Sequence, residues 1–224
     1  TKLDVEGKPL WICDARGNLV MQYIAPPKPN HAPLYDDPTP AWRPAYAMPS
    51  NAVPCYDIAG NLLFQHSMDA GDRWMLMDAA GKPMLAWDLN DYQGTAGAPA
   101  QATQQTRRFH TDYDALHRPT AQWLKINNSA PALIEAFQYC DTSAPNGATS
   151  LADAKRRNLI GQAVQHWDTS GLATVERIDL SGQLAHVTRT LIKPDEVGNQ
   201  DGVLDWNVSN RSTLLEGETY HLVT

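Results

Sequence analysis

Apolar and polar side chains alternate with a period of two along much of the chain. Between positions 184 and 191, Ala185, Val187 and Leu191 share one face of an extended segment, while His186 and Thr188 share the other. This period is typical of a strand, and neither face is wholly apolar, as in a sheet that water reaches on at least one side. The pattern predicts further strands at 19–24, 62–67, 73–77, 83–87, 119–126, 132–139, 161–167, 173–178 and 219–223.

Helical patterns are scarce by comparison. The segment 150–157 predicts a short helix, because Ser150 can cap its first turn, Asp153 lies in that turn and basic residues follow near its end. The segment 132–139 fits a short helix as well as it fits a strand. The predicted fold class is therefore all-β, built from repeated antiparallel β-hairpins, with at most one or two short helices.

A four-residue motif, Asp-x-x-Gly, recurs eight times, whereas random placement of the same residues would give about one copy. An aspartate that opens a turn accepts hydrogen bonds from backbone amides, and glycine adopts the positive φ that other residues resist. Several copies lead directly into an apolar segment, so the motif predicts a hairpin turn between two strands. The copies stand at Asp4/Gly7, Asp14/Gly17, Asp57/Gly60, Asp78/Gly81, Asp91/Gly94, Asp168/Gly171, Asp179/Gly182 and Asp195/Gly198. The predicted structural turn residues are Asp14, Gly17, Asp57, Gly60, Asp78, Gly81, Asp168, Gly171, Asp179 and Gly182.

Large aromatic side chains often stand directly before an aspartate. Tyr56, Trp87, Tyr113 and Trp167 precede Asp57, Asp88, Asp114 and Asp168 in this way. Exposed aromatics of an all-β repeat could stack on sugars, but a shared repeat position favours side chains that pack one hairpin on the next. We therefore predict that these four are structural repeat aromatics.

Proline interrupts the array between residues 24 and 54, where nine of the 16 prolines fall. Proline removes a donor from the strand ladder and disfavours regular elements, so this segment is predicted to be a long irregular insertion. Residues 94–106 form a smaller polar break. Neither break separates pieces of contrasting composition, so the prediction is a single repeat array over residues 1–224 with an insertion at 24–54.

Composition and charge narrow the classes of function. With a net charge of −7, the chain lacks the basic surface that binding to duplex nucleic acid requires. Its longest apolar runs are too short for a membrane span. The first residues do not resemble a secretory signal, and we expect the chain to be a piece of a longer polypeptide. Its three cysteines share no metal-ligand spacing and are interpreted as buried thiols.

Candidate chemistry is weak throughout the sequence. Carboxylate pairs such as Asp69/Asp72 and Asp112/Asp114 could serve acid–base catalysis, but turn capping and solvated loops account for nearly all of them. The seven histidines lack the spacing of a helical zinc motif, and the aspartates lack the spacing of a calcium-binding loop. No catalytic residue, metal site or cofactor is predicted.

Six segments resemble the YD-repeat family, which includes Rhs polymorphic toxins, the B and C components of Tc insecticidal toxin complexes, and teneurins. The resemblance is closest to the Tc and Rhs branch, and it spans most of the chain outside the proline-rich insertion. One departure is His117, which stands where the family has glycine. The segments are 14–21 (DARGNLVM), 56–63 (YDIAGNLL), 67–76 (SMDAGDRWML), 80–83 (AGKP), 113–120 (YDALHRPT) and 157–162 (RNLIGQ).

The resemblance implies a curved sheet that forms part of a hollow β-shell, which in the toxins encloses a C-terminal effector. It implies a secreted, non-enzymatic wall segment whose partners are neighbouring repeats, an encapsulated effector and other toxin-complex subunits. No segment matches the family's effector-cleaving region, an effector domain or a receptor-binding propeller. The alternative is a β-repeat binding module that recognises glycans or a cell-surface protein. A third option, a hydrolase that uses aspartate pairs, would require a concave site.

Overall fold

The computed structural model describes residues 1–25, 53–67, 70–92, 103–196 and 203–223. The chain divides into two compact units, Thr1–Arg108 and Phe109–Thr224, with the boundary inside one strand. Each unit is described by itself below.

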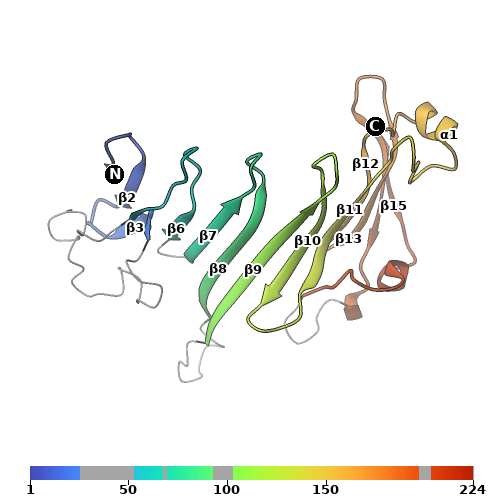
Figure 1. The fold of residues 1–224 in the computed structure, drawn as a ribbon. Helices are drawn as coiled ribbons and strands as arrows, with labels where there is room; N and C mark the ends of the chain where they lie inside the picture. The colour runs from blue at the N-terminus through green and yellow to red at the C-terminus, as the bar shows by residue number, and fades with distance from the viewer. Residues whose placement is uncertain (26–52, 68–69, 93–102, 197–202, 224) are drawn as a thin grey trace. The chain divides into compact units, whose positions relative to one another are not determined.

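Thirteen of the strands in the described residues pair in chain order as one antiparallel sheet, and two more form a separate ladder (Figure 1). The main-sheet strands are β1 (Lys2–Leu3), β2 (Pro9–Cys13), β3 (Leu19–Gln22), β6 (Phe64–Ser67), β7 (Gly71–Met77), β8 (Pro83–Tyr92), β9 (Thr103–Tyr113), β10 (Pro119–Ile126), β11 (Ala132–Tyr139), β12 (Ala163–Asp168), β13 (Gly171–Ile178), β14 (Leu184–Leu191) and β15 (Tyr220–Val223). The separate ladder joins β4 (Ile24–Ala25) to β5 (Val53–Pro54). The all-β prediction is confirmed.

The sequence predicts an irregular insertion over residues 24–54, but the structure has regular strand pairing at both ends of this segment. Ile24 pairs with Pro54 and Ala25 pairs with Val53, so a short ladder brackets residues 26–52, which lie outside the described residues. Proline is tolerated there because a two-stranded ladder consists of edge strands only. The polar break predicted at 94–106 is also shorter than expected, because β9 begins at Thr103.

The first unit has a small buried cluster on β2, β3 and β4, made by Leu10, Trp11, Leu19 and Ile24. A row of aromatic rings crosses β6, β7 and β8. Phe64 lies opposite Trp74 and Trp74 lies opposite Trp87, with ring centroids 4.4 Å and 6.3 Å apart.

The larger cluster of the second unit lies on β11 and the segment 203–215, which crosses one face of the sheet. The Trp206 side chain is fully buried, its backbone N–H donates to Leu133 O, and its indole N–H donates to Asp168 O. Asp205 accepts a hydrogen bond from the Leu133 amide at 2.9 Å. Apolar packing and backbone hydrogen bonds together hold this segment on the sheet.

The predicted helix is present as α1 (Leu151–Arg156), with Ser150 as its N-cap accepting from the Asp153 amide. Ala154 packs in a third cluster with Cys140, Leu159 and Val164. Two short 3₁₀ helices, η1 (Pro194–Glu196) and η2 (Arg211–Leu214), complete the described elements.

All three cysteines are free thiols, but only Cys140 is buried, and burial raises the pKa of its thiol. Cys13 and Cys55 are partly exposed, so the expectation of three buried thiols was wrong for these two. Both lie in the first unit, where the buried cluster is small.

Two predicted strands, 119–126 and 132–139, match β10 and β11 residue for residue, which resolves the helix-or-strand ambiguity at 132–139. Burial alternates only partly along β11, because the consecutive residues Leu133 and Ile134 are both buried. In the part of the chain that the structure describes, no helix is long and apolar enough to cross a membrane.

Candidate functional site: the hairpin turns and the contacts between them

The turn at Asp179 shows how the repeated motif builds a hairpin. The Gly182 N–H donates to Asp179 O at 3.2 Å, and the Asp179 N–H donates to Gln183 O at 2.9 Å. The carboxylate Oδ1 accepts from the Ser181 and Gln183 amides at 2.8 and 2.9 Å. Gly182 has a φ of 85°. This is a three-residue hairpin loop with a left-handed residue at its end, which closes β13 onto β14.

The same backbone pattern recurs at five other turns, which begin at Asp4, Asp14, Asp57, Asp78 and Asp114. In each, a carboxylate oxygen of the aspartate accepts from the backbone four residues on. Hydrogen bonding lowers the pKa of three of these carboxyls, with Asn18 donating to Asp14, Asn61 to Asp57 and Arg118 to Asp114. The carboxylates therefore serve their own turns.

His117 occupies the left-handed position of the Asp114 turn with a φ of 61°. Its amide still donates to Asp114 O at 2.9 Å, and its ring lies against Tyr113 with centroids 5.0 Å apart. The turn therefore keeps the geometry of the glycine-containing copies, although histidine rarely adopts this φ.

The Asp168/Gly171 copy forms a different turn. Asp168 pairs directly with Gly171, leaving a two-residue loop, and Gly171 has a φ of 136°. The Asp168 carboxylate accepts two hydrogen bonds from Arg189, at 2.9 and 2.5 Å. Partial burial raises the pKa of Asp168, but the hydrogen bonds from Arg189 and from the Ser170 amide outweigh this effect and leave the pKa lowered.

Two further predicted copies give no hairpin turn in the described residues. Asp91 lies inside β8, and Gly94 falls outside the described residues. Asp195 lies in η1, and Gly198 likewise falls outside them.

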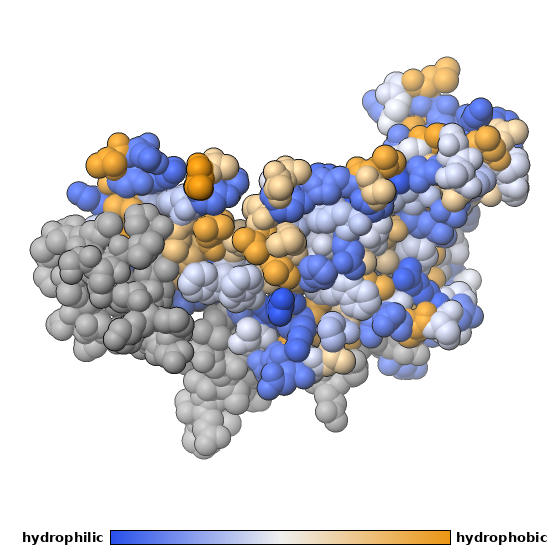
Figure 2. Space-filling model, in the orientation of Figure 1, coloured by the Kyte–Doolittle hydropathy of each residue, from blue (hydrophilic) through white to orange (hydrophobic). Residues whose placement is uncertain are grey.

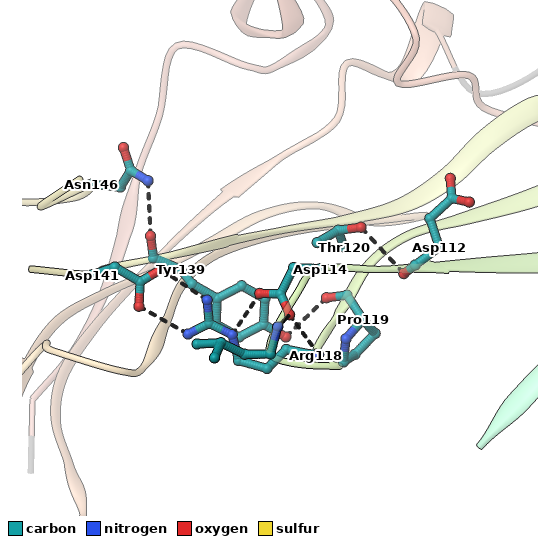
Figure 3. Close-up of polar contacts among 9 residues, drawn as sticks. Asp112, Asp114, Arg118, Pro119, Thr120, Tyr139, Asp141 and Asn146 are labelled. Carbon is teal, nitrogen blue, oxygen red and sulfur yellow. Dashed lines mark hydrogen bonds and ion pairs between the residues drawn. The ribbon is translucent and has the colours of Figure 1, made fainter. Parts of the chain in front are cut away.

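Arg118 links the Asp114 turn to the segment that follows β11 (Figure 3). Its Nε donates to Asp114 Oδ2 at 2.7 Å, and its two terminal nitrogens donate to the Asp141 carboxylate at 3.0 and 2.8 Å. The guanidinium also lies 4.1 Å from the centroid of the Tyr139 ring. Hydrogen bonds from Arg118 lower the pKa of Asp141, and the same bonds raise the pKa of Arg118.

Tyr139 completes this arrangement because its hydroxyl donates to Pro119 O at 2.9 Å. We call Arg118, Pro119 and Tyr139, with Asp114 and Asp141, the hairpin clasp. One charged side chain thereby joins a turn to the strand beside it and to the segment after that strand.

A related contact occurs in the first unit. Lys8 Nζ lies 5.5 Å from the Tyr56 ring centroid, and the Tyr56 hydroxyl donates to Pro9 O at 2.8 Å. In both places a basic residue and a proline directly follow the turn, and a tyrosine from a later segment covers them. The sequence repeats Asp-x-x-Gly-Lys-Pro at 78–83. The basic–proline pair is thus a sequence signal for this contact that the turn motif alone does not reveal.

The other predicted aromatics have separate roles. Trp87 lies within β8 opposite Trp74 and does not precede a turn, which differs from the predicted repeat position. Trp167 precedes the Asp168 turn and lies against the Arg211 guanidinium, 4.6 Å from its ring centroid. Interactions of this kind hold segments of the chain together.

Chemistry beyond these contacts is sparse in the residues that the structure describes. No group of three or more His, Cys, Asp or Glu side chains among them is placed to hold a metal ion. On the face drawn in Figure 2, hydrophobic and hydrophilic residues are interspersed among the coloured atoms. The organised polar groups of the described residues are found in the turns, in ion pairs, and in the buried pair of His66 and Asp72 on β6 and β7, whose Nδ1 and Oδ1 atoms are 2.8 Å apart.

Comparisons with known proteins show which proteins this chain is similar to. No family model matches the chain. The chain is 28% identical over 172 residues to the toxin subunit YenC2 of Yersinia entomophaga, and the match covers 75% of the chain and 17% of YenC2. The chain is homologous to this toxin subunit. The similarity confirms the resemblance that the repeat segments indicate.

Solved structures share the fold. The crystal structure of TcdB2–TccC3 matches with a TM-score of 0.57 at 20% identity, covering 98% of this chain and 9% of the other. The Photorhabdus luminescens Tc holotoxin pore matches with a TM-score of 0.57 at 21% identity, covering 94% and 8%. The chain thus spans a small part of the proteins that it matches, and their identity to it supports a shared fold alone.

Proposed function

We propose that the chain is a non-enzymatic wall segment of a secreted toxin-complex shell that encloses an effector polypeptide. Similarity to toxin-complex subunits supports a structural role in such a complex. The observation that carries the proposal is the hairpin clasp, because its charges are used to join hairpins. A wall built from hairpins requires contacts of this kind between each hairpin and the next.

The turn carboxylates support the same role. An acid–base catalyst needs a carboxyl whose pKa suits proton transfer near neutral pH. Asp14, Asp57, Asp114, Asp141 and Asp179 have lowered pKa values, and hydrogen bonds from nearby groups cause the lowering. Such groups remain ionised and hold backbone in place, which suits a scaffold.

The proposed partners are the neighbouring repeats of the shell, an enclosed effector and other subunits of the complex. The solved relatives combine TcdB2 with TccC3, so assemblies of this fold with a second component exist. An enclosed polypeptide would be shielded from proteases until the wall opens. The mechanism is therefore enclosure.

Limited proteolysis with intact-mass analysis tests the proposal on the product of the complete gene, purified under native conditions. We expect a separate C-terminal fragment that copurifies and resists protease until the shell is unfolded. Arg118→Met should make that fragment cleavable at lower protease concentration, because it leaves Asp114 and Asp141 without their shared partner. Arg16→Met is the matched control, since Arg16 is an exposed residue on a turn.

A product with neither a cleaved nor a shielded fragment would overturn enclosure. The alternative, a β-repeat module that binds glycans or a cell-surface protein, would then become the leading function. Equal protection of the fragment in the Arg118→Met and Arg16→Met proteins would retain enclosure and remove the hairpin clasp as its support.

A further inference from the structure

Two imidazole rings meet on one face of the β14–β15 pair. His186 Nε2 and His221 Nδ1 are 3.2 Å apart, and the ring planes differ by 27°. The strand register places His221 opposite Thr188 and His186 opposite Val223, so the two histidines are diagonal neighbours. Solvent reaches both side chains.

This separation suits chelation as well as a hydrogen bond. Zinc–imidazole bonds of about 2.0–2.1 Å at a near-tetrahedral angle place two ligand nitrogens about 3.2–3.4 Å apart. The two strands therefore hold the nitrogens at the bite distance of one metal ion before any ion arrives. Coordination through these atoms leaves the remaining ring protons on Nδ1 of His186 and Nε2 of His221.

We propose that His186 and His221 bind a divalent transition-metal ion, with zinc as the representative, and that the ion clips β15 to β14. Imidazole nitrogen favours Zn²⁺, Ni²⁺ and Cu²⁺, whereas Mg²⁺ favours oxygen ligands. Two protein ligands leave the remaining positions to water. Arg177 lies opposite His186 on β13, and its positive charge opposes the incoming cation. The affinity should therefore be in the micromolar range.

The consequence of binding follows from the placement of the two histidines on paired strands. His186 lies on β14 and His221 on β15, so both nitrogens can reach one ion only while these strands are paired. An ion that binds only the paired strands stabilises the closed state by mass action.

Titration calorimetry with ZnCl₂, combined with hydrogen exchange of β15, tests the proposal on the 224-residue chain. We expect micromolar zinc binding with a stoichiometry near one and slower exchange of the Tyr220–Val223 amides when zinc is present. His186→Gln and His221→Gln should each weaken binding at least about tenfold and abolish the effect on exchange. His110→Gln is the control, because His110 is an exposed histidine on another strand, β9.

Mg²⁺ at the same concentration should leave the exchange of β15 unchanged. The proposal fails if zinc binding is undetectable up to about 1 mM, or if both glutamine variants bind as the parent does. It also fails if His110→Gln removes the binding, since the ion would then sit elsewhere. His221 is exposed and His186 is partly exposed, so we expect both variants to fold, and circular dichroism can verify this before they are titrated.

Discussion

Two glycines from the same sequence motif should respond very differently to alanine. At Gly182, with φ at 85°, an added Cβ would meet no heavy atom within 4 Å, so only the backbone conformation opposes the substitution. At Gly171, with φ at 136°, the added Cβ would lie 2.2 Å from Thr190 O and 2.9 Å from Leu191 Cα. The neighbouring strand would have to move, because both of these atoms belong to backbone.

The expected magnitudes follow from these contacts. Gly182→Ala should destabilise the fold by about 1–2 kcal/mol, the cost of a left-handed conformation for a residue with a Cβ. Gly171→Ala adds overpacking against β14 and should cost at least about 3 kcal/mol. Gly217→Ala is the control, because Gly217 has open space and a φ outside the left-handed region. It should be neutral or stabilise by up to about 1 kcal/mol.

Urea unfolding followed by tryptophan fluorescence would measure these differences, with thermal melts as a second readout. For a chain of this size, 1 kcal/mol corresponds to a shift in melting temperature of about 2–4 °C. The midpoints should fall in the order Gly217→Ala, Gly182→Ala, Gly171→Ala. Equal losses at Gly171 and Gly182 would refute the close approach of β13 and β14. A Gly182→Ala midpoint equal to that of Gly217→Ala would refute the left-handed turn.

Three further predictions concern the second unit. Trp206→Ala should lower stability by about 3–5 kcal/mol in urea melts, and Trp206→Phe by clearly less, because the ring volume is largely kept while the bond to Asp168 O is lost. Ser150→Ala should cost about 0.5–2 kcal/mol, because the Asp153 amide loses its cap acceptor; an unchanged melting temperature would exclude the cap. Arg189 lowers the pKa of Asp168, so their ion pair contributes to the free energy of unfolding at pH values above the unfolded pKa of Asp168, near 3.8. This contribution is lost as pH falls through the lower folded pKa, and Arg189→Met should remove it. The stability difference between parent and Arg189→Met should therefore shrink in acid, and a difference that grew would contradict the ion pair.

Turn chemistry was the part of the fold that local sequence could predict. The turns at Asp14, Asp57 and Asp179 contain within five residues every hydrogen bond that defines them. The Asp168 turn follows the same motif but has a shorter loop, in which Asp168 pairs with Gly171 and its carboxylate accepts from Arg189. Arg189 lies 21 residues further on, so the local sequence does not reveal this contact.

Long-range contacts account for what the sequence did not reveal. β9 is rich in Gln, Thr and Arg and lacks an apolar alternation, so its strand character comes from its neighbours in the sheet. Trp206 is fully buried only because residues 203–215 cross the sheet face, which no local periodicity encodes. The hairpin clasp was equally hidden, since Arg118 and Asp141 are 23 residues apart.

The distribution of buried side chains connects these observations to a wall-like role. Most buried hydrophobic residues of the described chain belong to three separate clusters, each formed by neighbouring strands together with nearby helix or loop residues, and one of the clusters belongs to the first unit. In an array of this kind, stability is approximately a sum of local terms and contacts between neighbours. The turns satisfy their own polar groups, so a damaged turn should affect one hairpin, whereas loss of Arg118 disturbs a turn and the segment after the next strand together. The proposed wall would therefore tolerate variation at its turn tips, where Val5, Ile58 and Leu180 are fully exposed, and would depend more on the residues that join one hairpin to the next.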